Sequence, residues 1–139
     1  MLDLSEWSAN PSPLMKTMGF VRAISVDAEE GRAVVEFEAK IDQCHSGNVV
    51  QGGYVAGWID NAMATAVLFK TDFQNLVMSL EIKVSYYRAA NPGTVIAEGW
   101  IERIGKKTAF AEGLLRTRDG EIIAKASSTI ALLPQRKQG

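Results

Sequence analysis

In one long stretch of the chain, the apolar residues are spaced so that they would cover every side of a helix. Residues 51–69, QGGYVAGWIDNAMATAVLF, begin with Gly52 and Gly53 after one glutamine and continue mainly with apolar side chains. A helix that is apolar all round is buried rather than amphipathic. The pattern therefore predicts one long central helix that is entered through a glycine pair.

A single carboxylate interrupts this apolar stretch. Asp60 is the only Asp, Glu, Lys or Arg between Asp42 and Lys70. Because an unpaired buried carboxylate is costly, it must find hydrogen-bond donors, change its protonation or face a cleft. Asp60 is therefore the leading candidate for chemistry.

Two segments before the helix alternate between apolar and polar side chains. Residues 20–28 and 32–40 predict two strands that form a hairpin. In the second strand, Val35, Phe37 and Ala39 share the apolar face. This face is expected to pack on the helix.

Four further strands are predicted after the helix. Residues 76–87 alternate most clearly, and Ser79 belongs to the more polar face of this strand. The predicted apolar face consists of Leu76, Met78, Leu80, Ile82, Val84 and Tyr86. Residues 94–104, 108–118 and 121–133 follow as strands joined by hairpin-length connections.

The predicted order of elements indicates an α+β fold, an antiparallel β-sheet wrapped around one long central helix. A short helical turn is expected near residues 14–18, and a polar loop at residues 42–50 leads into the long helix. A length of 139 residues suits a single domain over residues 1–139. Because a sheet curled around a helix hides only one face, a homo-oligomer is expected.

Composition and charge exclude several classes of function. A formal net charge of -1 gives no basic surface for nucleic acid. A single cysteine, Cys44, excludes a disulfide framework and a cysteine-rich zinc site. No apolar run is long enough for a membrane span, and the amino terminus has no signal-peptide pattern. These features predict a cytoplasmic protein.

The order of elements and residues 51–67, QGGYVAGWIDNAMATAV, resemble the hotdog-fold acyl-CoA thioesterases of the phenylacetyl-CoA (PaaI-like) type. The hallmark of that family is His-Gly-Gly followed by a helix with an acidic residue. The resemblance covers roughly residues 15–133. It implies a hotdog fold, a homodimer or homotetramer, an acyl-CoA substrate, and no metal or cofactor. A medium-chain or aryl acyl group suits the apolar and aromatic side chains expected to line the pocket, such as Tyr54, Trp58 and Met63.

The resemblance assigns the principal catalytic roles. Gln51, Gly52 and Gly53 stand where the family has His-Gly-Gly, and Asp60 stands at the acidic position. The Gly52 N–H is expected to polarise the thioester carbonyl, helped by the positive end of the helix dipole. Asp60 is expected to act as general base or as nucleophile. Gln51 is a departure, because it replaces the histidine of the motif.

Two further catalytic positions follow from the resemblance. His45 takes the place of a loop amide, and Ser79 that of a serine in the first strand after the helix. In the family the helix carboxylate faces the loop of the partner subunit, so His45 and Gln51 of one chain are expected to meet Asp60 of the other. The residues expected to bind substrate are Asn48, Gly53, Tyr54, Arg88, Lys106 and Lys107.

Two other functions stay open at this stage. The first is a hotdog dehydratase or hydratase in which His45 and Asp60 act together on a 3-hydroxyacyl or enoyl thioester. The second is a non-catalytic acyl-CoA-binding protein, which the loss of the motif histidine favours and the retention of Asp60 disfavours. Cys44 is not expected to be a nucleophile, because its sequence neighbour His45 need not converge on it.

Overall fold

A computed structural model describes residues 4–135 of the chain. Its helices are α1 (Leu4–Ala9), α2 (Pro13–Thr17) and α3 (Gly52–Lys70), with a short 3-10 helix η1 (Ile41–Gln43). Its strands are β1 (Phe20–Asp27), β2 (Arg32–Ala39), β3 (Cys44–Ser46), β4 (Val49–Val50), β5 (Asn75–Tyr86), β6 (Gly93–Ile104), β7 (Thr108–Thr117) and β8 (Ile122–Pro134).

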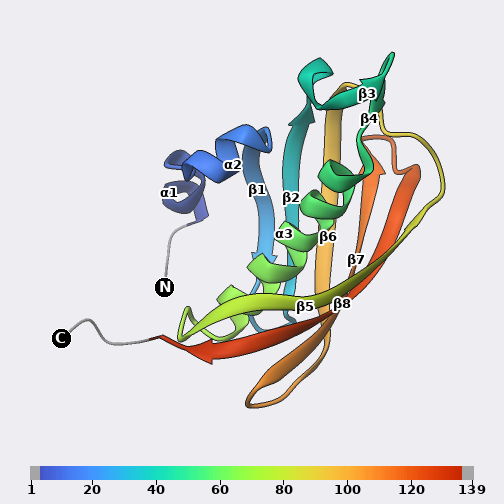
Figure 1. The fold of residues 1–139 in the computed structure, drawn as a ribbon. Coiled ribbons are helices and arrows are strands. Elements are labelled where there is room, and N and C mark those ends of the chain that lie inside the picture. The colour runs from blue at the N-terminus through green and yellow to red at the C-terminus, as the bar shows by residue number, and fades with distance from the viewer. Residues whose placement is uncertain (1–3, 136–139) are drawn as a thin grey trace.

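One antiparallel sheet curls around the long helix. Its strand order is β1-β2-β6-β7-β8-β5, so β1 and β5 form its two edges. Figure 1 shows α3 lying across the concave face of this sheet, with α1 and α2 beside β1. The prediction of an α+β fold, with an antiparallel sheet around one long central helix, is confirmed.

The middle of α3 lies directly on the backbone of the sheet. Gly99 of β6 and Gly113 of β7 are opposite each other in the ladder. A Cβ at Gly99 would lie 2.4 Å from the Met63 nitrogen, and one at Gly113 would lie 2.7 Å from Ile59 Cγ2. Glycine is therefore required at both positions, and this contact fixes the height of α3 above the sheet.

The first strand after the helix contains an irregularity that the sequence pattern did not reveal. The pairing of β5 with β8 shifts between Ser79 and Glu81, which leaves Leu80 as an extra residue in β5. Beyond this bulge, Ile82 and Val84 pack against the core as predicted. Before the bulge the facing is reversed, because Val77 packs against the core.

The prediction of one continuous apolar face from Leu76 to Tyr86 is therefore wrong for the first half of β5. Leu76 is 54% exposed, Met78 58% and Leu80 64%. A bulge adds one residue to the period of two, so side chains on either side of it point to opposite faces. By the same shift, Ser79 faces α3 instead of the polar side.

Short elements appear where the sequence suggested loops. The polar segment 42–50 contains the small hairpin β3–β4, and α1 was not predicted. The expected turn near residues 14–18 is α2, which begins after the capping side chain of Ser12. It ends before Gly19, whose φ of 80° is the left-handed conformation that favours glycine.

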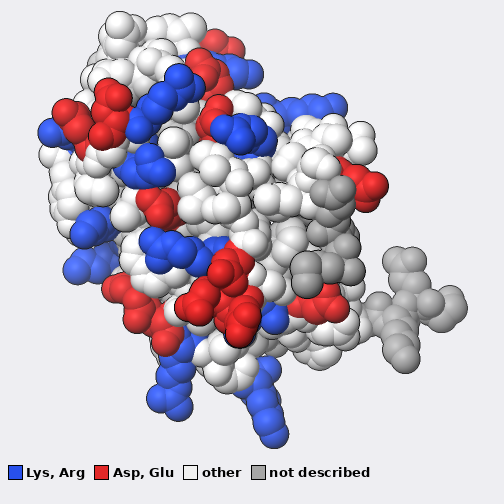
Figure 2. Space-filling view, turned by 180° about the vertical axis from the view of Figure 1, so that it is seen from behind, with Lys and Arg blue, Asp and Glu red and all other residues white. Residues whose placement is uncertain are grey.

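The outer face of the sheet carries charges of both signs. Figure 2, which views the molecule from behind, shows Lys and Arg interspersed with Asp and Glu. At its centre, Glu98 of β6 accepts from Arg116 at 2.8 Å and from Arg32 at 3.2 Å. Burial raises the pKa of Glu98, but these two guanidinium groups outweigh it and leave the pKa below its ordinary value.

Candidate functional site

The first turn of α3 leaves one backbone donor open. The Gln51 side chain accepts from the Gly53 N–H at 2.8 Å, and the Gln51 carbonyl accepts from the Tyr54 N–H at 3.0 Å. The Gly52 N–H has no hydrogen-bond acceptor within residues 4–135. A free N–H at the positive end of a helix is suited to binding a developing negative charge on oxygen.

A hollow of about 320 Å³ lies beside this turn. Its lining is mainly apolar and includes two tyrosines, His45 and Arg88. The residues around it are His45, Val49, Val50, Gly52, Val55, Tyr86, Tyr87, Arg88, Ala89 and Ala90. A largely apolar hollow with a few polar groups next to an open N–H has the character of a small-molecule site.

Asp60 is half-buried and is bound by a hydroxyl from the edge strand. The Ser79 hydroxyl donates to Asp60 Oδ1 at 2.6 Å. The resemblance assigned Ser79 only to a family serine position, and the bulge at Leu80 is what turns it towards the helix carboxylate. The second carboxylate oxygen has no donor among the described residues, so it is available to water or substrate.

Gly52 and Asp60 do not act at one point within a single chain. They are eight residues apart on one helix, which at about 1.5 Å per residue separates them by about 12 Å along the axis. A thioester carbonyl bound at the Gly52 N–H is therefore out of reach of Asp60 in the same chain.

His45 reaches the hollow but not the carboxylate. Its ring Nδ1 forms a hydrogen bond with the Ser46 hydroxyl at 2.9 Å, and it lines the hollow together with Gly52. The neighbouring Cys44 thiol contacts the Lys40 carbonyl at 3.6 Å. Cys44 and His45 therefore do not pair with each other in the described part of the chain.

The residues predicted to bind substrate divide into two groups. Gly53 and Tyr54 lie in the first turn of α3, where the Tyr54 ring packs beside Trp58 with ring centroids 6.2 Å apart. The Asn48 carbonyl accepts from the Asn91 side chain at 2.8 Å, which ties the β3–β4 turn to the segment before β6. Arg88 lies at the hollow and forms an ion pair with Glu121.

Lys106 and Lys107 lie at the other end of the sheet. β6 starts near the first turn of α3, because Val50 donates to the Ala90 carbonyl just before this strand. The twelve residues of β6 then run about 35 Å to the turn that carries both lysines. One chain therefore does not bring Lys106 or Lys107 to the glycine pair.

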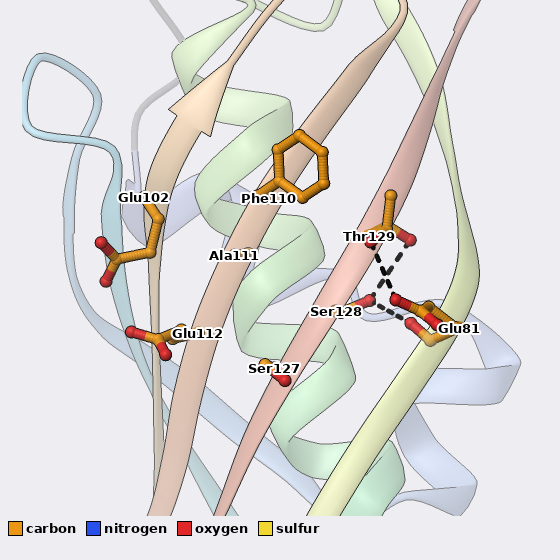
Figure 3. Close-up of a pocket in the computed structure, with 8 residues that line it drawn as sticks. All are labelled: Glu81, Glu102, Phe110, Ala111, Glu112, Ser127, Ser128 and Thr129. Carbon is orange, nitrogen blue, oxygen red and sulfur yellow. Dashed lines mark hydrogen bonds between the residues drawn. The ribbon is translucent and has the colours of Figure 1, made fainter.

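A second hollow, of about 390 Å³, lies on the outer face of the sheet. Figure 3 shows that most of its side chains, among them Glu102, Phe110 and Glu112, project away from α3, which runs behind the strands. Three of them are carboxylates, Glu81, Glu102 and Glu112. The hydrogen bond between the last two lowers the pKa of Glu102 and raises that of Glu112. This acidic surface disfavours the phosphates of coenzyme A, so the hollow at the helix start is the better candidate site.

Two residues of the site region were missed by the sequence analysis. Tyr86 was assigned only to an apolar strand face, yet its phenol donates to the Gly52 carbonyl at 2.7 Å. Gln43 is buried, and its side chain joins the Lys40 N–H to the Thr17 carbonyl. A tyrosine on a strand face that packs towards a helix usually places its hydroxyl on a polar partner, and this signal could have identified Tyr86.

Between Leu4 and Gln135, no group of three or more His, Cys, Asp or Glu side chains could hold a metal ion. Within the same range, no helix is both long and apolar enough to cross a membrane.

Comparison with known proteins supports the hotdog resemblance. The family model of the thioesterase superfamily matches residues 47–124. The "Putative esterase SSO2140" of Saccharolobus solfataricus is 29% identical over 113 residues, which cover 81% of this chain and 80% of that protein.

Two solved structures show the same fold. One is described as a putative thioesterase, a phenylacetic acid degradation-related protein from Ralstonia eutropha JMP134. It is 25% identical with a TM-score of 0.81 over 92% of this chain and 98% of that chain. The other is the E. coli PaaI protein, 18% identical with a TM-score of 0.80 over 94% of this chain and 91% of that chain. The hotdog fold implied by the resemblance is confirmed.

Proposed function

Because the chain belongs to the thioesterase superfamily, we propose that it is an acyl-CoA thioesterase that hydrolyses a medium-chain or aryl acyl-CoA to the free acid and coenzyme A. The observation that carries this proposal is the open Gly52 N–H at the start of the helix that also holds Asp60. Thioester hydrolysis needs an oxyanion donor and a carboxylate, and this helix supplies one of each.

The Gly52 N–H would bind the thioester oxygen. As the acyl carbon becomes tetrahedral, negative charge develops on this oxygen, and a donor already fixed in place stabilises it without reorganisation. The dipole of α3, a helix of 19 residues, adds positive potential at the same point. Because glycine has no side chain, the substrate can approach the main chain closely.

Asp60 would supply the attack on the acyl carbon, either by taking a proton from water or as the nucleophile itself. The hydrogen bond from Ser79 holds one carboxylate oxygen and leaves the other free. In the general-base route, the proton of water passes to Asp60 and then to the departing thiolate of coenzyme A, which is released as the thiol.

Two chains are needed to bring these groups together. The separation of about 12 Å along α3 between Gly52 and Asp60 suggests that the Gly52 of one chain works with the Asp60 of another. The edge strand β5 has a neighbour on one side only, and Leu76, Met78 and Leu80 are exposed on it. We therefore propose a homodimer, alone or within a homotetramer, because an uncovered apolar edge favours association.

Coenzyme A would leave the site past Arg88. This side chain lies at the hollow, and its ion pair with Glu121 is solvent-exposed, so a phosphate can compete for it at low cost. Lys106 and Lys107 could contribute only from another chain, given their place at the far end of the sheet. The name of the Ralstonia eutropha protein supports an aryl acyl group.

The test is thiol release from short, medium, long-chain and aryl acyl-CoAs. Wild type should turn over at least one of them, and Asp60→Asn should lower kcat at least about 100-fold with little change in Tm, because the amide is no base. Asp72→Asn is the matched control, since Asp72 is exposed beyond the end of α3 and asparagine tolerates its φ of 50°. Turnover by Asp60→Asn at the wild-type rate would refute the mechanism.

A further inference from the structure

The glycine pair at the start of α3 has more backbone freedom than a helix normally needs. Gly52 and Gly53 carry no Cβ, and the first-turn N–H groups have no helical partners. An oxyanion donor is effective only when its direction is fixed before the reaction. Something outside the helix backbone must therefore hold Gly52.

Three contacts surround the Gly52 Cα. The peptide before it is held by the Tyr54 N–H on the Gln51 carbonyl. The peptide after it is held at both ends, because Tyr86 donates to the Gly52 carbonyl and the Gly53 N–H donates to the Gln51 side chain. Only the Gly52 N–H stays open in the described part of the chain.

Tyr86 comes from a strand that is hydrogen-bonded to its neighbour in the sheet. It pairs with Ala124 in the β5–β8 ladder, and the next residue continues the attachment through the Tyr87 N–H on the Ile123 carbonyl at 2.8 Å. The ring is also close to Gly52, since a Cβ at Gly52 would lie 3.2 Å from the Tyr86 hydroxyl oxygen. The pairing of β5 in the sheet therefore places the Tyr86 phenol beside Gly52.

The phenol gives its hydrogen to Gly52 and has none left to donate to substrate. A tyrosine hydroxyl has one hydrogen to donate, and in Tyr86 the Gly52 carbonyl takes it at 2.7 Å. We propose that Tyr86 is a positioning residue: by holding the Gly52 carbonyl, it fixes the torsion angles of Gly52 and aims the Gly52 N–H at the thioester oxygen. This inference rests on the proposed thioesterase function.

The same strand also holds the catalytic carboxylate. Ser79 binds Asp60 and Tyr86 binds Gly52, seven residues apart on β5 and eight apart on α3. β5 is therefore the element that orients both the oxyanion donor and the carboxylate of one chain, although it belongs to the edge of the sheet.

The test compares Tyr86→Phe with Tyr87→Phe. The first keeps the ring and removes the hydroxyl that binds Gly52. The second removes a phenol from the same hollow that makes no hydrogen bond within residues 4–135. Tyr86→Phe should lower kcat about tenfold relative to Tyr87→Phe with KM within about twofold, because loss of a whole oxyanion donor costs about 100- to 1,000-fold and misdirection costs less.

A second measurement does not depend on turnover. The ¹⁵N relaxation of the labelled protein should show a more mobile Gly52 amide in Tyr86→Phe than in wild type or Tyr87→Phe. If no acyl-CoA is hydrolysed by wild type but Gly52 loosens in this way, the thioesterase proposal fails and the positioning contact stands. A Gly52 amide of unchanged mobility, or a kcat equal to that of Tyr87→Phe, overturns the inference.

Discussion

The middle of α3 and its first turn meet the rest of the molecule in opposite ways. In the middle, the helix backbone rests on Gly99, and the fully buried side chains of Ile59 and Met63 pack over Gly113. In the first turn, polar side chains from Gln51 and Tyr86 hold the backbone beside an open hollow. One helix therefore has a closed apolar contact and an open polar one.

The two regions of α3 therefore have different roles: the middle stabilises the fold, and the first turn provides a group for chemistry. The apolar contact has no space for a ligand, and any added atom must displace backbone. The polar contact leaves one N–H unused, which costs some stability but provides a donor. Substitutions in the two regions should therefore change different measurements.

The largest effect is expected at the closed contact. Gly99→Ala places a methyl group 2.4 Å from the Met63 nitrogen, so helix and sheet must move apart. We expect a loss of at least about 3 kcal/mol and a fall in Tm of about 10 °C or more by thermal unfolding. Gly105→Ala is the control, because its Cβ would meet only the Thr108 carbonyl at 3.6 Å. An unchanged Tm in Gly99→Ala would disprove the close approach.

Substitution at the open contact, the first turn of α3, should change the activity instead of the stability. Gly52→Ala crowds Tyr86 and hinders approach to the N–H, so kcat/KM should fall about 100-fold while Tm changes little. Gly57→Ala in the same helix meets only Met18 at 3.6 Å and should keep full activity with a slightly higher Tm. Equal activity in the two variants would remove Gly52 from the mechanism.

A smaller effect is expected on the outer face behind the closed contact. Glu98→Gln removes ion pairs to Arg32 and Arg116 and should cost about 1 kcal/mol in urea unfolding at pH 7, without loss of activity. Because folding lowers the pKa of Glu98, its contribution is present above the unfolded value near 4.5 and is lost as pH falls through the folded value.

The difference between wild type and Glu98→Gln should therefore shrink below about pH 4.5. Glu36→Gln, which breaks a more exposed pair with Arg22, gives the comparison for an ordinary surface contact. If the difference in unfolding free energy between wild type and Glu98→Gln stays constant from pH 7 to pH 3, Glu98 stabilises the fold by something other than its charge.

The smallest effect is expected from substitution of Gln51, which stands where the family has the histidine of its motif. Gln51→His should leave activity unchanged or raise it, because a neutral imidazole nitrogen can accept from the Gly53 N–H as the Gln51 oxygen does. Gln51→Ala should lower stability by about 1 kcal/mol through loss of this cap. Thiol-release rates and Tm check both, and a tenfold loss in Gln51→His would contradict the assignment of Gln51 as a cap.

Much of the fold could be predicted from the sequence, because buried elements have a regular period. The apolar stretch 51–69 gave α3 to within one residue, and Val35, Phe37 and Ala39 are buried as expected. The bulge at Leu80 could not be predicted, since an extra residue changes no local composition. It reversed the facing of Leu76 and Met78.

The candidate site was predictable only in part, for a similar reason. Asp60 could be recognised as a lone charge in an apolar stretch, and the resemblance pointed to Ser79 as a candidate but not to the hydrogen bond between the two. The contact of Tyr86 with Gly52 joins positions 34 residues apart, which no local pattern records. The distance of Lys106 from the glycine pair depends on the direction of β6. That direction is known only once the arrangement of the strands is known.

The strand order also sets when the site can form during synthesis. β5 pairs only with β8, which is made about 36 residues later, so at about 5–20 residues per second the ribosome delivers it about 2–7 seconds afterwards. Until then, β5 has no ladder to hold Ser79 and Tyr86 in place. The nascent chain can thus carry α3 for seconds before either polar contact to it is secured, and the site matures only once β8 has been made.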